Sequence, residues 1–307
     1  MIKKTLYFGN PAYLSLRNKQ LVIKLPEVVK NDMLPENFKA DAKKTIAVED
    51  LGVVILDNKR ITITHGLMDS LLENNCALIT CDTRRMLVGL MLPLTGNTMQ
   101  TERFQCQIDA SAPLKKQLWQ QTVKAKIENQ AFVLANQSKV IEKNMLTCWS
   151  AHVKSGDPDN YDARAAVYYW SNIFPGIKGF TRRRDGVPPN NLLNCGYALL
   201  RAVVARSLVA SGILPTLGIH HRNKNNAYSL ADNIMEPYRP FVDKLVLEIV
   251  ESGSDVSKLS HEIKAQLLHI PEIVVSINEQ RSPLMVAVEQ TTASLYKCFS
   301  GELGKIK

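Results

Sequence analysis

The sequence lacks several features that mark common classes of protein. Its six cysteines include no Cys-x-x-Cys pair, which argues against zinc knuckles and a disulfide framework and favours reduced, mostly buried thiols. No apolar run is long enough to cross a bilayer, and the N-terminus shows no signal-peptide pattern. Glycine loops that cradle nucleotide phosphates, internal repeats and low-complexity segments are also missing. We therefore expect a cytoplasmic, globular protein that contains no membrane span and needs no nucleotide cofactor.

The charge balance points toward an acidic partner. The 307 residues include 38 lysines and arginines against 29 aspartates and glutamates, a net charge of +9. Such a surplus favours nucleic acid or an anionic membrane surface, and charge alone does not choose between them. With 45% hydrophobic and 22% charged residues, the chain is expected to fold into one large or two ordinary domains.

The first part of the chain is predicted to be rich in strands. Short apolar or alternating runs, separated by turn residues, predict strands over residues 3–8, 12–16, 20–25, 44–48, 53–56, 60–64 and 76–81, and one helix over residues 66–73. Many short strands with close turns are typical of a small sandwich. We assign residues 1–82 to an N-terminal β-rich domain and residues 83–98 to a linker.

The rest of the chain has helical periodicity. Leu114, Leu118, Ala125 and Phe132 recur at spacings of four and seven and predict a long amphipathic helix. Further helices are expected over residues 141–153, 162–174, 191–211, 229–252, 257–268 and 284–299. The expected fold class is therefore α+β, with an N-terminal β-sandwich-like domain followed by a larger all-α C-terminal domain, residues 99–307.

The segment over residues 218–243 has the highest density of chemically active side chains. Its predicted helix places Asp232 and Glu236 on one face and Asn233 beside Glu236. Pro237 removes one helical hydrogen bond and predicts a kink that would aim Glu236. A histidine from the preceding loop could meet these carboxylates, and mixed oxygen and imidazole ligation suits Mn²⁺, Mg²⁺ or Zn²⁺.

Basic residues of the same segment, Arg222, Lys224 and Arg239, would suit a phosphodiester. The residues alone leave another interpretation open. The two carboxylates could form a solvated helix face paired with Arg239, and His220 or His221 could be a packing residue, because short motifs match by chance.

A family resemblance begins at this segment. Gly-Ile-His-His, followed fifteen residues after His221 by Glu236 within Asn-Ile-Met-Glu-Pro-Tyr-Arg-Pro-Phe-Val-Asp, resembles the signature of the CRISPR adaptation integrase family, CRISPR-associated protein one. The form of the segment is most similar to that of members from type II systems. By this resemblance the metal-binding histidine is His221.

Two further segments match in the family's order. Residues in register with a second family motif are Asn160, Asp162, Ala165, Ala166, Tyr169 and Trp170. Asp162 replaces the glutamate ligand usual in the family, and Asn233 replaces its usual aspartate. The third segment, residues 180–206, carries three consecutive arginines before a helix. A basic run is usually a solvated surface, but the family places these residues toward DNA.

The resemblance implies a set of site residues. The metal ligands and catalytic residues would be Asp162, His221 and Glu236, with Asn233 and Asp232 as possible auxiliaries. The DNA-binding residues would be Arg182, Arg183, Arg184, Arg222, Lys224 and Arg239.

The resemblance also implies an activity in CRISPR adaptation, a branch of antiviral defence. The expected enzyme is a DNA endonuclease and integrase that depends on Mg²⁺ or Mn²⁺. It would join 3′-hydroxyl ends of spacer-precursor double-stranded DNA to the CRISPR repeat by transesterification. The family implies a homodimer joined to a small second CRISPR-associated adaptation protein, with the N-terminal domain used for dimerisation and partner contact and no membrane involved.

Two other functions stay open. One is a plain metal-dependent nuclease, a hydrolase that cleaves DNA without joining it. The other is a catalytically impaired DNA-binding scaffold, which the replacements at Asp162 and Asn233 would explain.

Overall fold

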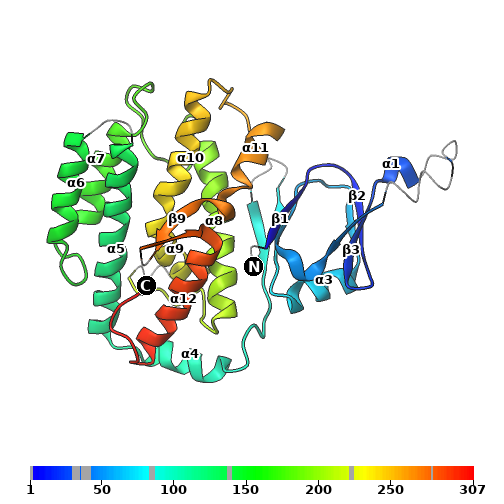
Figure 1. Cartoon of the computed structure of the whole chain (residues 1–307), viewed down its shortest axis with the longest axis horizontal. Coiled ribbons are helices and arrows are strands. Elements are labelled where there is room, and N and C mark those ends of the chain that lie inside the picture. The colour runs from blue at the N-terminus through cyan, green and yellow to red at the C-terminus, as the bar shows by residue number, and fades with distance from the viewer. Residues whose placement is uncertain are drawn as a thin grey trace. The chain divides into compact units, whose positions relative to one another are not determined.

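The chain divides into two compact units, residues 1–96 and residues 97–307 (Figure 1). The structure, a computed structural model, describes residues 3–29, 35, 43–82, 87–136, 140–220, 225–277 and 279–307. The range expected to be a linker, residues 83–98, contains a described strand over residues 87–91, and this strand pairs within the sheet of the first unit.

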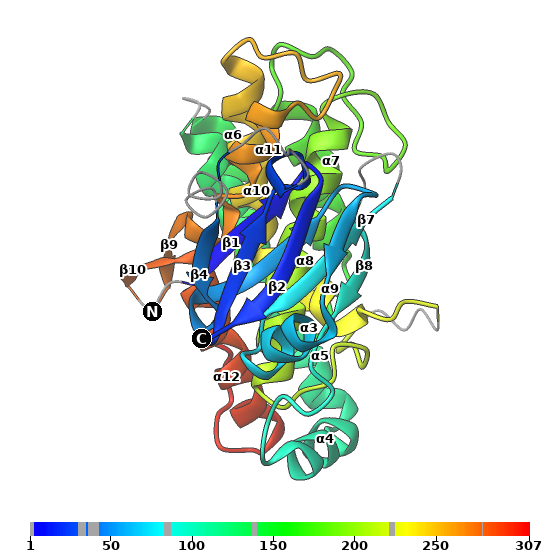
Figure 2. The same ribbon diagram turned by 90° about the vertical axis from the view of Figure 1, so that its right-hand side faces the viewer.

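Strands dominate the first unit. They are β1 (Lys4–Phe8), β2 (Ala12–Arg17), β3 (Gln20–Lys24), β4 (Lys44–Ala47), β5 (Leu51–Leu56), β6 (Ile61–Ile63), β7 (Ala77–Cys81) and β8 (Leu87–Met91), accompanied by α1 (Pro26–Val29), η1 (Val48–Asp50) and α3 (His65–Glu73). They form two four-stranded sheets, in the orders β1-β5-β7-β8 and β4-β3-β2-β6 (Figure 2).

The core of this unit lies between the two sheets and α3. Strand β5, Leu-Gly-Val-Val-Ile-Leu, is buried along nearly its whole length and pairs in parallel with both β1 and β7. A continuous apolar run of this kind is expected for a strand covered on both faces. Leu14 of β2, Leu51 of β5 and Leu67 of α3 share one buried cluster, so each sheet contributes one face to the core.

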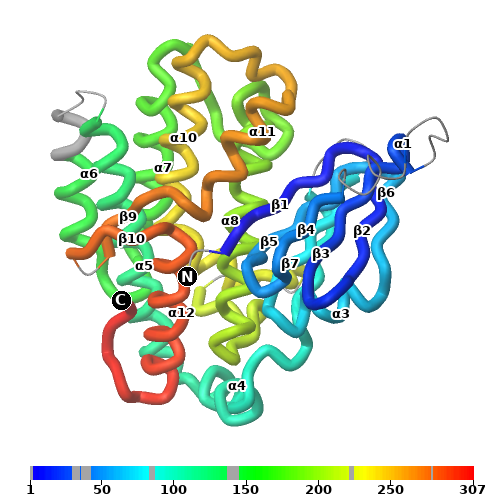
Figure 3. The backbone as a smooth tube through the Cα atoms, turned by 45° about the vertical axis from the view of Figure 1, so that its right-hand side comes forward, coloured from blue at the N-terminus to red at the C-terminus, as the bar shows by residue number. Residues whose placement is uncertain are grey.

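The second unit is mainly helical. Its elements are α4 (Gln100–Asp109), α5 (Ala112–Ala135), α6 (Val140–His152), α7 (Tyr161–Asn172), α8 (Asn190–Ala210), α9 (Ser229–Met235), η2 (Glu236–Tyr238), α10 (Arg239–Glu251), α11 (His261–Leu267), η3 (Ile270–Glu272), β9 (Val274–Ile277), β10 (Gln280–Pro283) and α12 (Leu284–Phe299). Helices α5, α6 and α7 pack side by side, and α10 contacts both α5 and α8 (Figures 1 and 3).

Helix α8 is the core helix of this unit. Contrary to the expectation from the sequence, this helix is long and apolar enough to cross a membrane, but 72% of its apolar window is buried inside the structure, as expected for a helix surrounded by protein. Helix α5 begins where Ser111 accepts a hydrogen bond from the backbone N–H of Leu114. A serine cap followed by Pro113 is a strong helix start.

The expected α+β fold class is confirmed. Two details differ. The second unit is not purely helical, because strands β9 and β10 pair in antiparallel fashion. The face predicted for α5 is confirmed only in part: Leu118 is buried together with Trp119, Val123 and Ile127, whereas Phe132 is 49% exposed.

Candidate metal centre

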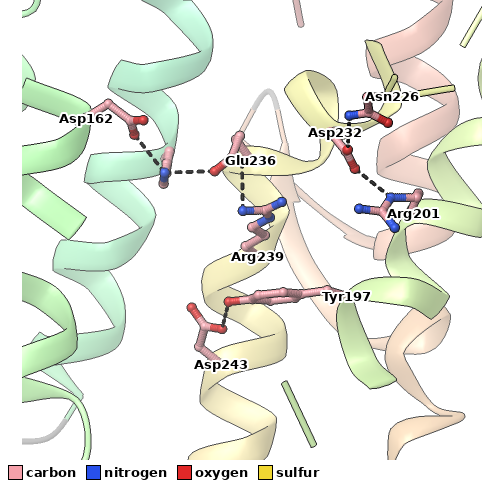
Figure 4. A network of polar contacts seen from close by, with 9 residues as sticks. Asp162, Tyr197, Arg201, Asn226, Asp232, Glu236, Arg239 and Asp243 are labelled. Carbon is pink, nitrogen blue, oxygen red and sulfur yellow. Dashed lines mark hydrogen bonds and ion pairs between the residues drawn. The ribbon is translucent and has the colours of Figure 1, made fainter. Parts of the chain in front are cut away.

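Two carboxylates from different helices meet one lysine in the second unit. The Lys126 Nζ atom, on α5, lies 2.7 Å from Oδ1 of Asp162 on α7 and 2.8 Å from Oε2 of Glu236 in η2. The three side chains are 11%, 23% and 9% exposed. Asp162 and Glu236, two of the three ligands that the sequence predicts, are therefore brought together around a positive charge (Figure 4).

The start of α7 fixes the position of Asp162. Asp157 accepts hydrogen bonds from the backbone N–H groups of Tyr161 and Asp162, both at 2.9 Å. Asn160, in the left-handed conformation with φ of 55°, makes no side-chain cap bond. Asp157 thus supplies the side-chain cap of α7, although Asn160 occupies the N-cap position. The cap holds Asp162 in the first turn, where a carboxylate is stabilised by the helix dipole.

Pro237 shapes the backbone at Glu236. The helix predicted over residues 229–252 is interrupted here by a single 3-10 turn, η2, between α9 and α10. Glu236 itself keeps helical angles, φ −52° and ψ −46°, so the interruption changes the hydrogen-bond pattern and not the conformation of this residue. Asn129 of α5 donates a hydrogen bond of 2.7 Å to the carbonyl oxygen of Pro237. This bond ties the turn to the helix that carries Lys126.

Lys126 keeps its positive charge in this setting. Burial lowers the pKa of its ammonium, but Glu236 and Asp162 raise it by more, so the pKa lies above its ordinary value. A charged lysine on a buried helix face is costly unless it is paired. Here one ammonium faces two carboxylates, so the three groups keep one net negative charge, which Arg239 beside Glu236 balances.

Glu236 has a second cationic partner. Its Oε1 atom lies 2.8 Å from a terminal nitrogen of Arg239. The guanidinium of Arg239 lies over the ring of Tyr197, 4.9 Å from the centroid, and Arg182 lies over the same ring at 5.2 Å. Both contacts are cation–π interactions, so Tyr197 links the carboxylate site to the arginine segment over residues 182–184.

Asp243 holds Tyr197 in place by a buried hydrogen bond. It is 1% exposed and accepts hydrogen bonds from the hydroxyl groups of Tyr197 and Tyr169, the latter at 3.2 Å. Burial raises the pKa of Asp243 to about 7, although the two tyrosines and Arg239 lower it. Figure 4 shows the contact of Asp243 with Tyr197 and that of Arg239 with Glu236, and the guanidinium of Arg239 over the Tyr197 ring connects the two.

The two auxiliary candidates have other partners. Asp232 pairs with Arg201 at 2.6 Å and accepts a hydrogen bond of 2.8 Å from Asn226. Asn233 is fully buried, and its Oδ1 atom accepts from the backbone N–H groups of Ile219 at 3.0 Å and His220 at 3.3 Å. Asn233 therefore holds the backbone that directly precedes His221 in the sequence.

His220 is held a second time, because its ring stacks on Trp119 of α5 with centroids 4.3 Å apart. Three predicted site residues, His221, Arg222 and Lys224, lie outside the described residues. Within the described part of the chain, no three Asp, Glu, His or Cys side chains gather closely enough to hold an ion.

The arginine segment is fastened to the start of α8 by two asparagines. The fully buried Asn190 accepts hydrogen bonds at 3.0 Å from the Arg182 guanidinium and the Arg183 backbone N–H, and it donates to the carbonyl oxygens of Thr181 and Val187.

Asn194 accepts a hydrogen bond of 2.7 Å from Arg182 and donates one of 2.6 Å to the carbonyl oxygen of Arg184. Arg182 is thus engaged within the protein, while the side chains of Arg183 and Arg184 are exposed.

The donor set fits a hard divalent ion. Two carboxylates already reach one common cation, and oxygen ligands of this kind are those that Mg²⁺ and Mn²⁺ prefer. Asp162 reaches the shared ammonium as closely as Glu236 does, so the shorter side chain does not prevent convergence.

Sequence patterns did not identify Lys126, Tyr197 or Asp243 as parts of this network. A usable signal existed for Lys126. It follows Trp119 by seven residues and Val123 by three, so it lies on the buried stripe of α5, where a charged residue requires a buried partner.

Fold and site together define a two-unit α+β protein that carries a carboxylate-lined cation site on the helices of its second unit. The family model described as CRISPR associated protein Cas1 matches residues 6–266. The chain belongs to this family, which confirms the resemblance seen in the sequence.

Relatives and solved structures agree with this assignment. The CRISPR-associated endonuclease Cas1 of Neisseria meningitidis serogroup C (strain 8013) is 35% identical over 294 residues, covering 96% of this chain and 91% of that protein. A CRISPR-associated endonuclease Cas1 of Pyrobaculum aerophilum is 24% identical, covering 84% of this chain and 90% of that protein.

Two solved structures share the fold. A casposase bound to integration product has a TM-score of 0.75 at 17% identity, covering 100% of this chain and 93% of that one. A Cas1 protein from Thermotoga maritima has a TM-score of 0.73 at 16% identity, covering 97% of each chain.

Proposed function

We propose that this chain is a metal-dependent DNA integrase of CRISPR adaptation, which joins the 3′-hydroxyl ends of spacer-precursor DNA to the CRISPR repeat. The observation that carries the proposal is the convergence of Asp162 and Glu236 on the Lys126 ammonium. Two carboxylates from separate helices that share one cation have the chemistry to hold a metal ion. The endonuclease names of the relatives and the casposase with its integration product support the same class of reaction.

The metal would be Mg²⁺ or Mn²⁺, held by Asp162, Glu236 and His221. When bound, such an ion supplies a Lewis acid that polarises a phosphodiester and stabilises charge on its oxygens. The chain's own residues would position the DNA. Arg183 and Arg184 are exposed and held in place by the backbone contacts of their loop, which suits contact with phosphates.

The proposed reaction exchanges one phosphodiester for another. The 3′-hydroxyl oxygen of the incoming DNA forms a bond to phosphorus, the bond from phosphorus to the 3′-oxygen of the repeat strand breaks, and the leaving oxygen receives a proton. Arg239 lies beside Glu236, where it would contact a phosphate. Arg222 and Lys224, which follow His221 in the sequence, are proposed to make further phosphate contacts. No nucleotide cofactor is required.

The assembly is part of the proposal. A homodimer joined by a small second CRISPR-associated protein, acting in the cytoplasm, would present two active sites to the two ends of a repeat. Solved relatives of the same fold include a Cas6-RT-Cas1–Cas2 complex and a TtCas1–DNA complex. We assign dimerisation and partner contact to the N-terminal unit, and the charge of +9 suits a protein that holds long duplex DNA by its backbone.

The alternative functions make different products. A plain metal-dependent nuclease would cleave branched DNA without joining it. A scaffold, suggested by the replacement of glutamate at Asp162, would bind DNA and produce neither cleavage nor joining.

The test is strand transfer of a labelled DNA fragment into a supercoiled plasmid carrying the repeat array, with the small partner and Mn²⁺ present. We expect joined product from the native chain and none from His221→Ala. Cleavage without joining would identify the nuclease. No product from the native chain, together with product from Asp162→Glu, would identify the impaired scaffold.

A further inference from the structure

We infer that Lys126 is a resident cation of the metal centre, defined as an ammonium that occupies the position between Asp162 and Glu236 and has to leave it when a divalent ion binds. The inference rests on the proposed function, because it concerns the same carboxylates. It adds a residue that controls how readily the site takes up metal.

The oxygen atoms of Glu236 show why the two cations compete. Oε1 is occupied by Arg239 at 2.8 Å, and Oε2 is occupied by Lys126 at 2.8 Å. Lys126 also holds Oδ1 of Asp162 at 2.7 Å. Departure of this one ammonium would release an oxygen from each carboxylate at once, whereas departure of Arg239 would release only one.

Distances also argue against simultaneous occupation. An ion of the Mg²⁺ type binds its oxygens at about 2.1 Å, closer than the ammonium does. An ion that used the same two oxygens would lie within a few ångströms of Nζ, where two positive charges repel strongly in a poorly solvated site. Lys126 has a flexible four-carbon side chain with rotatable donors, which allows the ammonium to move away while α5 stays in place.

Lys126 also stabilises the arrangement of the two carboxylates in the metal-free site. Without a positive charge between them, the buried carboxylate of Glu236 and the partly buried carboxylate of Asp162 would repel each other, and their charges would be uncompensated. With Lys126 between them, Asp162 and Glu236 are held together before any metal arrives. The cost is a lower affinity for the ion, since each binding event has to break two ion pairs.

A matched control lies two residues away on the same helix. The side chain of Lys124 is 53% exposed and pairs only loosely with Glu128, at 3.9 Å. It carries the same charge on the same helix but on the solvent-facing side. Lys124→Met therefore removes an equal charge without touching the site.

The first experiment uses the unmodified chain. Purified full-length protein is treated with an amine-reactive acetylating reagent, with and without saturating Mn²⁺, and acetylation is quantified at each lysine by mass spectrometry. Electron paramagnetic resonance of Mn²⁺ measures the occupancy independently. We expect Lys126 to be protected in the metal-free protein and to react at least about fivefold faster once Mn²⁺ is bound, as burial is lost, while Lys124 reacts equally in both.

The second experiment measures Mn²⁺ affinity in two variants. Lys126→Met should bind Mn²⁺ about tenfold or more tightly than the native chain, as expected when a full charge is removed beside the ion. Lys124→Met should differ by less than about twofold. The metal-free Lys126→Met protein should unfold at a lower temperature than the native chain, and Mn²⁺ should remove most of that difference.

Two results would overturn the inference. One is continued protection of Lys126 in protein shown to be saturated with Mn²⁺, which would mean that lysine and metal coexist. The other is equal or weaker Mn²⁺ binding by Lys126→Met, which would mean that the lysine supports the ligands and does not compete. Failure of both the native chain and Lys126→Met to bind Mn²⁺ would instead refute the proposed metal-dependent function and the inference with it.

Discussion

Replacement of Asp243 by asparagine should change how stability depends on pH. Asp243 is 1% exposed, and burial raises the pKa of its carboxyl to about 7 from an ordinary value of 3.8. The difference is about three pH units, and each unit corresponds to about 1.4 kcal/mol, so ionisation of this group costs the folded state about 4 kcal/mol.

The sign follows from where the protons bind. Between pH 4 and pH 7 the folded protein keeps the Asp243 proton that the unfolded chain has lost. The stability that Asp243 contributes is therefore fully present below pH 4 and is lost as the pH rises through 7. The uncharged amide introduced by Asp243→Asn would mimic the protonated acid at every pH. The groups that face this carboxyl are Tyr169 of α7, Tyr197 of α8, Arg239 of α10 and Arg182.

The assay is urea unfolding of the native chain and of Asp243→Asn at pH 5 and pH 8. The free energy of unfolding of the variant, relative to the native chain, should rise by about 3 kcal/mol between these pH values, somewhat less than the full amount because pH 5 already lies above the ordinary carboxyl pKa. Asp185→Asn, at an exposed position of the same unit, should show no such change. A difference between variant and native chain that is the same at both pH values would refute the assignment of the raised pKa to Asp243.

Two further predictions concern the asparagines. Asn190→Ala should lower the free energy of unfolding by about 2–4 kcal/mol, because four hydrogen bonds are lost in a buried position; urea unfolding checks this, and a loss below about 0.5 kcal/mol would contradict it. Asn233→Ala should weaken Mn²⁺ binding at least about tenfold by releasing the backbone before His221. Asn233→Asp, which keeps an acceptor for both N–H groups, should bind Mn²⁺ at least as well as the native chain, and equal losses in the two variants would show that the acceptor is not what matters.

Much of the fold could be predicted from local sequence. The alternation of apolar and turn residues located the strands of the first unit, and Pro237 located the break between α9 and α10. Helix α5 shows the limit of such patterns. Within the regular series Leu114, Leu118, Ala125 and Phe132, Leu118 is buried but Phe132 is 49% exposed. A long helix offers more than one such series, and packing also buried Trp119 and Ile127.

The site was predictable only in part, for a physical reason. Asp162 and Glu236 are 74 residues apart in the sequence, and no local periodicity reports that two helices bring them to one point. The resemblance to a family supplied that pairing. The resemblance did not reveal that Lys126 lies between the two carboxylates. Nor did it reveal that Asn233 accepts hydrogen bonds from backbone N–H groups. Both findings depend on three-dimensional contacts of this chain.

Two polar contacts of helix α7 come from residues on one of its faces. Asp162 meets Lys126 at one end, and Tyr169, seven residues or about two turns later, meets Asp243 on α10. Rotation of α7 about its axis would break one of these contacts, and a shift along the axis would strain both. The two contacts therefore fix both the rotation of α7 and its position along its axis, and through them Asp243 of α10 helps to hold Asp162 beside Lys126.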